Sequence, residues 1–542
     1  MAIWSAKKDD DPEASPQNGE GDGNGNGHGA GRRNGNSSEP AAPRLSEADE
    51  RTHLLPASSA HDGYLSPDDP AVSPYNLWSV RFLRYFTVFF AIITFLWWVL
   101  LLVSIFVSPP GMHSRGSGFF DFSFTTLTMG LLLVDLLFFS TPSKAAQVTC
   151  LVVSVFLLVD MILILTIPRI RIEEGWVGIA SAIWALLISI WTIVTDRVVA
   201  WGKHEEEERL TGRMESRRTL REWCAVLTST VILVVLAIVA VLLTATLILR
   251  ARDASLPVPG ERFFVDGDKY QIHLYCDGKS TGVDGKKLPT VLFEAGEYPF
   301  AHGMIQVAEN AITNGSIGRY CYSDRPGFGW SDNAPSPFSA GMAADVLSEA
   351  LARSGETGPW ILASAGVGSI YSRIFSSRHG RDVKGLLLIN PLHEDLLHRL
   401  SSPSRGFLLW AWGIISPLGL DRLSGALFNG RTREDRVYGR STYQGGKYIK
   451  AKLQESLVAD SLTKNEVSSA RHIQREKTPL VLISSAIDTR KDSEWERKQR
   501  DLSHLTRNLL NWDIVEKAPS EVWKTQEGRD IIEKRLKELV FA

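Results

Sequence analysis

The distribution of hydrophobic residues divides the chain into three parts. Residues 1 to about 76 show no apolar periodicity, five long apolar runs follow, and short strand-like and helix-like stretches alternate after about residue 259. Each run reaches the roughly 20 residues that cross the hydrocarbon core of a bilayer. The runs lie near 85–107, 119–139, 146–167, 175–195 and 224–249. Because five such runs in succession are rare in soluble proteins, the pattern predicts a bundle of about five transmembrane helices within residues 77–250, embedded in a lipid bilayer.

The first part, residues 1–76, is rich in Gly, Asn, Ser, Pro, Asp and Glu. Such a composition cannot bury enough apolar surface to fold, so we expect a disordered tail. No apolar stretch follows Lys7 and Lys8, so the start does not fit a signal peptide. Acidic residues among the first twelve disfavour a mitochondrial presequence.

Basic residues in the short loops predict the orientation of the bundle. The loop between the fourth and fifth runs has the strongest cluster, which comprises Arg197, Lys203, Arg209, Arg213, Arg217, Arg218 and Arg221. Basic loops remain in the cytosol. Five spans then place the N-terminal tail in the cytosol and the C-terminal part in a lumen or outside the cell.

Two carboxylates, Asp135 and Asp160, lie within the apolar runs. An acid inside the membrane is a functional candidate by default. No basic partner is evident within the spans, and both acids lie within one or two turns of a span end. We therefore favour a structural or interfacial role over ion transport.

Short apolar runs alternate with helical stretches after residue 259, which is typical of a parallel sheet covered by helices. The segments PTVLFEAG, YSDRPGFGWSD, PWILASAGVGSIYSR and GLLLINPLHED closely resemble the α/β-hydrolase superfamily over residues 259–542. The resemblance implies a mostly parallel, doubly wound sheet, with residues 396–470 inserted as a helical cap over the pocket. The apolar run 407–420 would pack that cap, line an apolar pocket or lie on the membrane surface. Joined to the membrane part, this domain resembles an uncharacterised fungal family.

The nucleophile of such enzymes is a Ser in a tight G-x-S-x-G turn. This chain reads Ser364-Ala365-Gly366-Val367-Gly368, which puts Gly366 in the nucleophile slot. A shifted register with Ser364 as nucleophile would place Leu362 at a crowded small-residue position. Gly366 provides no side chain to attack a carbonyl.

The triad His should follow the last strand, but His504 is the last His of the chain and precedes that strand. Glu521 occupies the His slot. Glu297 follows FEAG, where an oxyanion would be stabilised, and is unfavourable there unless it turns to solvent. Asp488 is either a remnant of the triad acid or an ordinary loop residue.

These losses predict a pseudoenzyme that binds a lipid, an acyl compound or a protein partner. The alternatives are an active lipase or esterase that uses Ser364 with Asp488, and a transporter or receptor whose function lies in the membrane bundle. The net charge of -2 excludes nucleic acid as an evident partner, and four Cys exclude a multi-Cys zinc array. We expect no cofactor and no metal.

Three further sites bear on the compartment. The resemblance implies that the second and fourth strands are neighbours, which would let Cys276 and Cys321 form a disulfide, the alternative being two buried thiols. Asn314 begins an N-x-S glycosylation pattern. Glu50, Leu54 and Leu55 resemble an acidic dileucine sorting signal, so a vacuolar or endosomal membrane is favoured, other endomembranes remain open, and mitochondria are disfavoured.

Overall fold

The computed structural model describes residues 74–212, 219–281, 285 and 287–541. The predicted sorting residues Glu50, Leu54 and Leu55, and the tail around them, lie outside the described residues.

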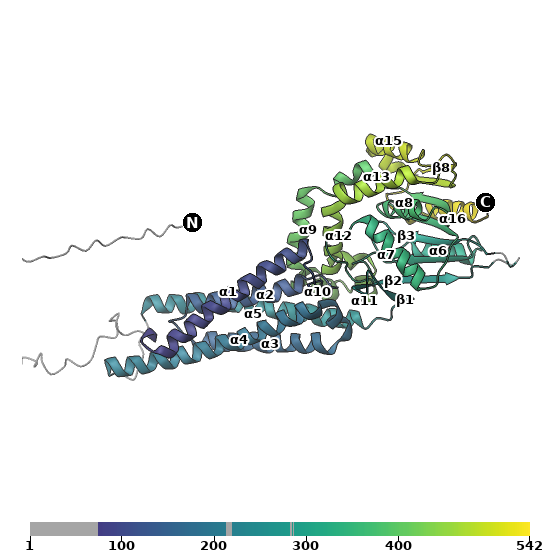
Figure 1. Cartoon of the computed structure of the whole chain (residues 1–542). Helices are drawn as coiled ribbons and strands as arrows, with labels where there is room; N and C mark the ends of the chain where they lie inside the picture. Colours follow the sequence, from purple (N-terminus) through teal and green to yellow (C-terminus); the bar gives the residue numbers. More distant parts are fainter. Residues whose placement is uncertain (1–73, 213–218, 282–284, 286, 542) are drawn as a thin grey trace, which may run out of the picture. The chain divides into compact units, whose positions relative to one another are not determined.

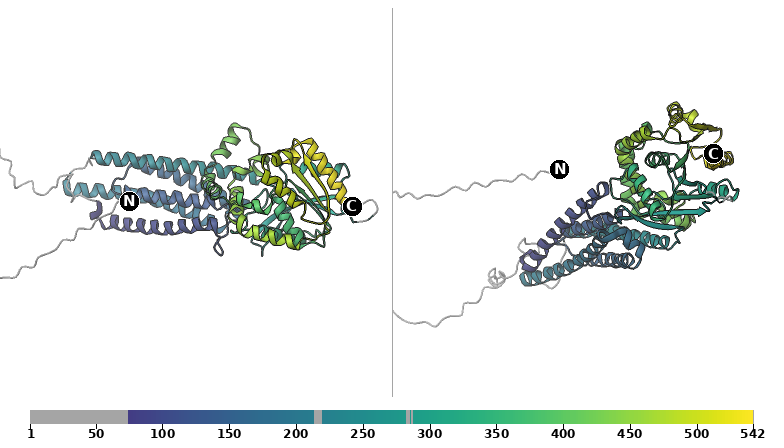
Figure 2. Two further views of the ribbon diagram at one scale, coloured as in Figure 1. Left: turned by 90° about the horizontal axis from the view of Figure 1, so that it is seen from above. Right: turned by 45° about the vertical axis from the view of Figure 1, so that its right-hand side comes forward.

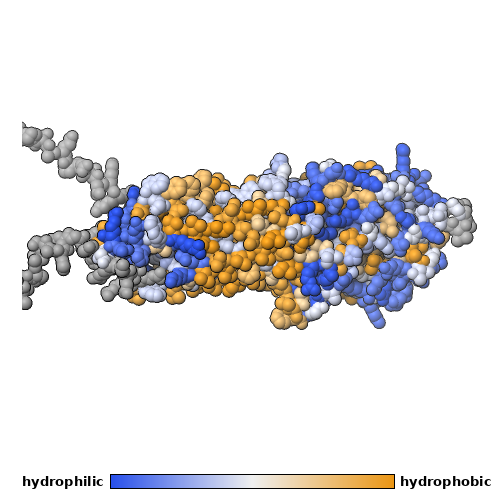
Figure 3. Space-filling model, turned by 90° about the horizontal axis from the view of Figure 1, so that it is seen from below, coloured by the Kyte–Doolittle hydropathy of each residue, from blue (hydrophilic) through white to orange (hydrophobic). Residues whose placement is uncertain are grey.

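Five helices are long and apolar enough to cross a membrane, as the apolar runs predict. They are α1 (Trp78–Phe106), α2 (Phe119–Leu137), α3 (Lys144–Thr166), α4 (Pro168–Thr211) and α5 (Leu220–Ala254). Figures 1 and 2 show them side by side as a bundle. A broad hydrophobic surface covers the bundle in Figure 3, whereas the α/β domain is mostly hydrophilic. Such a surface is suited to lipid.

The fourth helix is much longer than its apolar run. It begins at Pro168 and bends at Gly175, whose φ of +64° is a left-handed conformation that glycine adopts readily. It then continues past the apolar run through Glu205–Glu208 to Thr211. Hydropathy marks only the part inside the bilayer, which explains why the predicted span 175–195 is shorter at both ends.

The two intramembrane acids lie in different surroundings. Asp160 is fully buried within α3. Asp135 of α2 accepts a hydrogen bond from the Thr87 hydroxyl at 3.4 Å. Neither carboxylate has an ion pair with a basic residue among the described residues. Their proposed structural role stays a prediction.

The C-terminal part is built on an eight-stranded sheet in the order β1-β2-β4-β3-β5-β6-β7-β8 (Figure 1). The strands are β1 (Glu261–Val265), β2 (Tyr270–Gly278), β3 (Thr290–Glu294), β4 (Arg319–Ser323), β5 (Trp360–Ala365), β6 (Val383–Ile389), β7 (Leu480–Ser485) and β8 (Leu509–Val515). Only the β1–β2 and β2–β4 pairs are antiparallel. The order is the one that the α/β-hydrolase resemblance implies.

Helices cover both faces of the sheet. Helices α6 (Ile305–Thr313) and α16 (Gln526–Phe541) pack on one face with Val291, Phe293 and Ile361 of the central strands. Helices α7 (Ala340–Arg353), α8 (Gly368–Arg378) and α13 (Lys464–Ile473) cover the other face, over the alternate residues of the same strands. Because successive strand residues point to opposite faces, the continuous apolar runs of the sequence supply both cores.

The insert 396–470 packs mainly against the membrane helices. It contains α9 (Pro403–Ile415), α10 (Leu420–Phe428), α11 (Arg433–Val437) and α12 (Gly446–Val458). Helix α9 contacts α2, whereas α10 and α11 contact α5. Among the described residues that line the main cavity, the insert contributes only Arg399 and Leu400. Lys452 and Tyr448 of the insert also contact Glu297, which lines the cavity, and the extent of the cap over the pocket stays a prediction.

Part of the apolar run 407–420 packs against the membrane helices, and part of it lines an apolar cavity. Gly413 of α9 lies against the ring of Phe119 of α2, which is fully buried. Trp410 of α9 lines a separate apolar cavity with Leu102 of α1. Phe407 and Leu408 remain exposed on the outer side of α9. The run is thus partly packed and partly open to the surroundings of the bundle.

We expect Gly413→Ala to destabilise the protein, because its Cβ would lie 2.1 Å from Phe119 Cζ, a ring with no room to move. Overpacking of this kind costs about 1–3 kcal/mol. The matched control is Gly406→Ala on the same helix, where the nearest atom is Ser456 Oγ at 3.8 Å and a gain of about 0.5–1 kcal/mol in helix propensity is expected. Thermal unfolding of the full chain in detergent compares the two. Equal midpoints would refute the close packing of α9 on α2.

Candidate functional site

A cavity of about 560 Å³ lies where the parallel strands end. Gly296, Gly366, Asn390, Asp488 and Glu521 each follow a different strand, namely β3, β5, β6, β7 and β8, and all line the cavity. Ligands of open α/β sheets bind at the carboxyl ends of the strands. The fold thus gathers in one place the positions that the sequence singles out from separate motifs.

Gly366 lies in the turn between β5 and α8 with a φ of +50°. Its N–H donates to the Ile389 carbonyl at 3.0 Å. A Cβ at this position would have only the Cα of Gly296, at 3.9 Å, within 4 Å, so the cavity has room for a side chain there. By contrast, a Cβ at Gly368 would lie 2.3 Å from the Ala295 carbonyl oxygen. The backbone at Gly368 therefore packs closely on Ala295, as a tight turn needs, whereas Gly366 has no side chain at the nucleophile position.

Ser364, the alternative nucleophile, is fully buried in the middle of the sheet. It pairs with Glu294 of β3 on one side and Leu388 of β6 on the other. Its Oγ has no hydrogen-bond partner among the described residues, and it does not line the cavity. A substrate in the cavity has no access to this hydroxyl in the described conformation.

Asp488 reaches the cavity but is bound to an amide. The side-chain amide of Asn390 donates to Asp488 Oδ2 at 2.7 Å and to the Ser520 carbonyl at 3.3 Å. Trp495 Nε1 donates to Asn390 Oδ1 at 3.3 Å. The carboxylate that would orient a catalytic His is thus held by a network around Asn390, a residue that the sequence motifs did not single out.

The His slot contains Glu521, whose carboxylate forms an ion pair with Lys524. The cavity nevertheless has an imidazole from another element: His302, in the segment between β3 and α6, lies with its ring 5.3 Å from the ring of Tyr298. Burial lowers the pKa of His302, although the Glu521 carboxylate opposes this shift. Sequence reasoning missed this residue because it sought a His only after the last strand. The available signal was that His302 follows Gly296 by six residues, in the loop after β3, whose residues line the cavity.

Glu297 turns toward α12 and has a half-exposed side chain. Its carboxylate forms an ion pair with Lys452 Nζ at 2.7 Å, and Arg405 lies 4.0 Å away. Lys452 lowers the pKa of Glu297 to about 2. The Tyr448 hydroxyl donates to the Glu297 carbonyl at 2.8 Å. The negative charge in the oxyanion loop is therefore neutralised by the insert, and that loop is fastened to α12.

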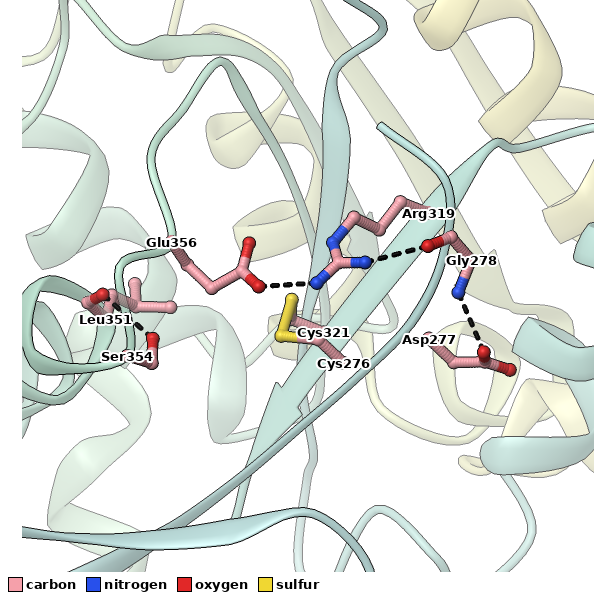
Figure 4. The surroundings of a disulfide bond; sticks show 8 residues. All are labelled: Cys276, Asp277, Gly278, Arg319, Cys321, Leu351, Ser354 and Glu356. Carbon is pink, nitrogen blue, oxygen red and sulfur yellow. Dashed lines mark hydrogen bonds and ion pairs between the residues drawn. A yellow bond between two sulfur atoms is a disulfide. The ribbon is translucent and has the colours of Figure 1, made fainter. Parts of the chain in front are cut away.

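Cys276 and Cys321 face each other in the antiparallel β2–β4 register and form a disulfide (Figure 4). Arg319 forms an ion pair with Glu356 beside it and donates to the Gly278 carbonyl. Glu356 lies close to both sulfurs, but a disulfide leaves no thiolate for a metal ion.

Asn314, the predicted glycan acceptor, is exposed at the end of α6. Its amide donates to Glu533 Oε1 at 2.9 Å, and Ser316 Oγ donates to the same carboxylate. The position is accessible, and glycosylation stays a prediction.

Comparisons with known proteins identify the family. The profile of a family described as "Region of unknown function (DUF2417)" matches residues 50–276. An uncharacterised protein of Schizosaccharomyces pombe is 32% identical over 528 residues, which cover 91% of this chain and 97% of that protein. The chain belongs to the family of this fission yeast protein. An uncharacterised vacuolar membrane protein of Saccharomyces cerevisiae is 28% identical over 385 residues. That match covers 60% of this chain and 59% of the budding yeast protein.

Solved structures resemble the C-terminal half. The enol-lactonase from Burkholderia xenovorans covers 52% of this chain and 100% of its own, with 13% identity and a TM-score of 0.36. A probable hydrolytic enzyme from Pseudomonas aeruginosa covers 53% of this chain and 95% of its own, with 15% identity and a TM-score of 0.39. At such identities the likeness concerns the fold alone.

We predict that Cys276 and Cys321 resist alkylation in unreduced, denatured full-length protein and react only after reduction. Cys150 and Cys224, which are free in the structure, provide internal controls because both should react without reductant. Peptide mass mapping after differential alkylation measures all four. Free labelling of Cys276 and Cys321 without reductant would contradict both the bond and the oxidising compartment that it requires.

Proposed function

We propose that this membrane protein binds an acyl or lipid ligand in the former active-site cavity of its α/β-hydrolase-like domain without hydrolysing it. The observation that carries the proposal is Gly366, which occupies the nucleophile position of an otherwise well-formed turn and lines the cavity. Covalent catalysis on this fold begins with a side-chain hydroxyl at that position. A cavity without the nucleophile can still hold a ligand.

The remaining catalytic roles are also reassigned. Glu521 pairs with Lys524, and Asp488 is held by Asn390, so neither is arranged as a partner of a triad His. His302 lines the cavity, but it comes from the segment between β3 and α6 and not from the position after β8 that a triad His occupies. The burial of Ser364 disfavours the alternative of a displaced nucleophile.

The walls of the cavity favour a ligand with an apolar chain. Met304, Val367, Leu392, Trp495 and Trp523 form its apolar part. Tyr298, His302 and Asn390 provide polar groups that suit a carboxyl or ester head. An apolar pocket with a few placed polar groups is the usual form of a small-molecule site.

A second apolar cavity, of about 460 Å³, supports a ligand that comes from the membrane. It is formed by Leu102 and Phe106 of α1 together with Phe407 and Trp410 of α9. Arg399 and Leu400 line the first cavity, and the next residues, Ser401 and Ser402, line the second. Consecutive residues of one segment therefore line the two cavities. An acyl chain in the second cavity would lie beside both the membrane helix α1 and the α/β domain.

The location follows from the loop charges and the relatives. We propose a cytosolic N-terminal tail, a lumenal C-terminal domain and a vacuolar or endosomal membrane. The budding yeast relative is described as a vacuolar membrane protein. The Cys276–Cys321 pair and the exposed Asn314 agree with a lumenal domain, and differential alkylation tests that side of the membrane.

We expect the full-length protein to show no serine-hydrolase activity. A fluorophosphonate probe and an activated short-chain ester should report no labelling and no turnover. Gly366→Ser alone should remain inactive because Glu521 offers no imidazole, whereas Gly366→Ser with Glu521→His is the smallest change expected to restore labelling. Ester hydrolysis by the unmodified chain above a Gly366→Val control would refute the proposal, and labelling lost in Ser364→Ala would support the hydrolase alternative.

Acyl binding is expected to depend on the wall of the cavity. Leu400→Trp should fill part of the space and weaken binding of a fluorescent long-chain fatty acid about tenfold, which corresponds to about 1.4 kcal/mol. The matched control is Leu509→Trp on the edge strand β8, which should bind as the unmodified chain does. Fluorescence titration of the full chain in detergent compares them. Equal affinities for both variants would place the acyl site elsewhere.

A further inference from the structure

A smaller cavity, of about 100 Å³, lies where the membrane helices meet the α/β domain. Ends of α2, α4 and α5 form one side, with Phe120 and Ala254 among the lining residues, and the insert forms much of the other. Five basic side chains line it: Arg169, Arg250, Arg422, Arg436 and Lys447. This cavity is separate from the one that contains Gly366.

Carboxylates of the described residues form ion pairs with four of these five bases. Glu173 pairs with Arg169 at 3.2 Å and with Arg250 at 2.9 Å. Asp253 pairs with Arg422 at 2.8 Å and with Arg436 at 2.6 Å. Glu174 adds a third acid, 2.6 Å from Arg250. Glu173 and Asp253 line the cavity together with the five cations, and Asp332 and Asp324 act on Lys447 from beyond ion-pair distance.

Lys447 is the lining base that has no ion pair among the described residues. Its ammonium donates to the Gly329 carbonyl at 2.8 Å, and no carboxylate of the described residues lies within ion-pair distance of it. Burial lowers the pKa of Lys447 to about 8. Since that value is still above neutral pH, the group remains largely protonated and able to donate.

Arg422 provides unused donors of the right geometry. Its Nη2 donates to Asp253 Oδ2 at 2.8 Å. Within the described part of the chain, its Nε and Nη1 donate no hydrogen bond, and Nη2 keeps a second hydrogen, which forms a two-donor edge with one of these nitrogens. A guanidinium with a free edge can form two parallel hydrogen bonds with a phosphate.

We propose that this cavity binds a phosphate group through Arg422 and Lys447. The volume equals about three times the ~30 Å³ that a water occupies in the liquid, which is room for a group of that size. An anion there would pair with Lys447 and with the unused donors of Arg422, which are costly to bury without partners. Because the cavity lies at the ends of the spans, where lipid headgroups are found, we infer that the phosphate belongs to a phospholipid or to a free phosphate compound.

The test uses full-length protein in detergent, freed of bound lipid, at constant ionic strength. The probes are inorganic phosphate, a short-chain phosphatidic acid and the matching diacylglycerol, which lacks the phosphate. Phosphate should raise the unfolding temperature, and phosphatidic acid should raise it more than diacylglycerol does, because any acyl binding in the Gly366 cavity is common to the two lipids. A stronger effect of phosphatidic acid identifies a headgroup site, and an equal effect identifies a site for free phosphate.

Two variants decide whether these residues form the site. Arg422→Gln and Lys447→Gln should each raise about tenfold or more the phosphate concentration that is needed for a given rise in unfolding temperature, because each removes charge-assisted hydrogen bonds. Lys447→Arg should keep the response of the unmodified chain. Arg490→Gln, an exposed arginine of α14 (Ala486–Lys491), is the matched control. Unfolding temperatures without phosphate show which variants fold. Equal responses in folded Arg422→Gln, Lys447→Gln and control proteins would overturn the proposal, as would an equal stabilisation by acetate. The effect of inorganic phosphate and the difference between phosphatidic acid and diacylglycerol do not depend on the Gly366 cavity, so failure of this site leaves the proposed acyl binding untouched.

Discussion

Buried ion pairs between the last membrane helix and the insert fasten the two halves of the protein together. Asp253 near the end of α5 is almost fully buried and is shared by Arg422 of α10 and Arg436 of α11. Removing one member of such a buried cluster leaves an uncompensated charge, which typically costs about 3–5 kcal/mol. The pairs therefore restrict how the insert can dock, whatever they add to net stability.

The docking of the insert positions both proposed sites. Its first residues, Arg399 and Leu400, line the cavity that contains Gly366, and its Lys452 holds Glu297 of the oxyanion loop. Its later residues Arg422 and Lys447 line the basic cavity beside the spans. An insertion that elsewhere would serve as a lid thus joins the α/β domain to the bundle.

The sequence predicted the elements better than the contacts between them. Apolar runs located all five membrane helices and the strands, because burial on both faces produces continuous hydrophobic segments. The β2–β4 adjacency that brings Cys276 to Cys321 came from the α/β-hydrolase resemblance, which carries strand order. The positions after the strands, including Gly366 and Glu521, were assigned in the same way, and they meet at one cavity.

Contacts that depend on tertiary packing could not be predicted from the sequence. Nothing in the sequence relates Arg250 to Glu173 and Glu174, which are 77 and 76 positions away and meet only when α4 and α5 pack. His302 was overlooked because its role depends on which side of a loop faces the cavity. The surroundings of the run 407–420 were left open because the same apolar run can face a pocket or a membrane helix, and the fit of Gly413 on Phe119 shows that it meets α2.

Gly366 and Gly368 differ in what the fold requires of them. Gly368 is required by the fold, since any side chain there would strike the Ala295 carbonyl. Gly366 is not required in that way: its surroundings leave room for a Cβ, and only its positive φ favours glycine. In a hydrolase that strain is carried by the nucleophile as part of its mechanism. Here the turn keeps a positive φ at Gly366 without a side chain at that position, and its backbone still lines the cavity, as the proposed binding function requires.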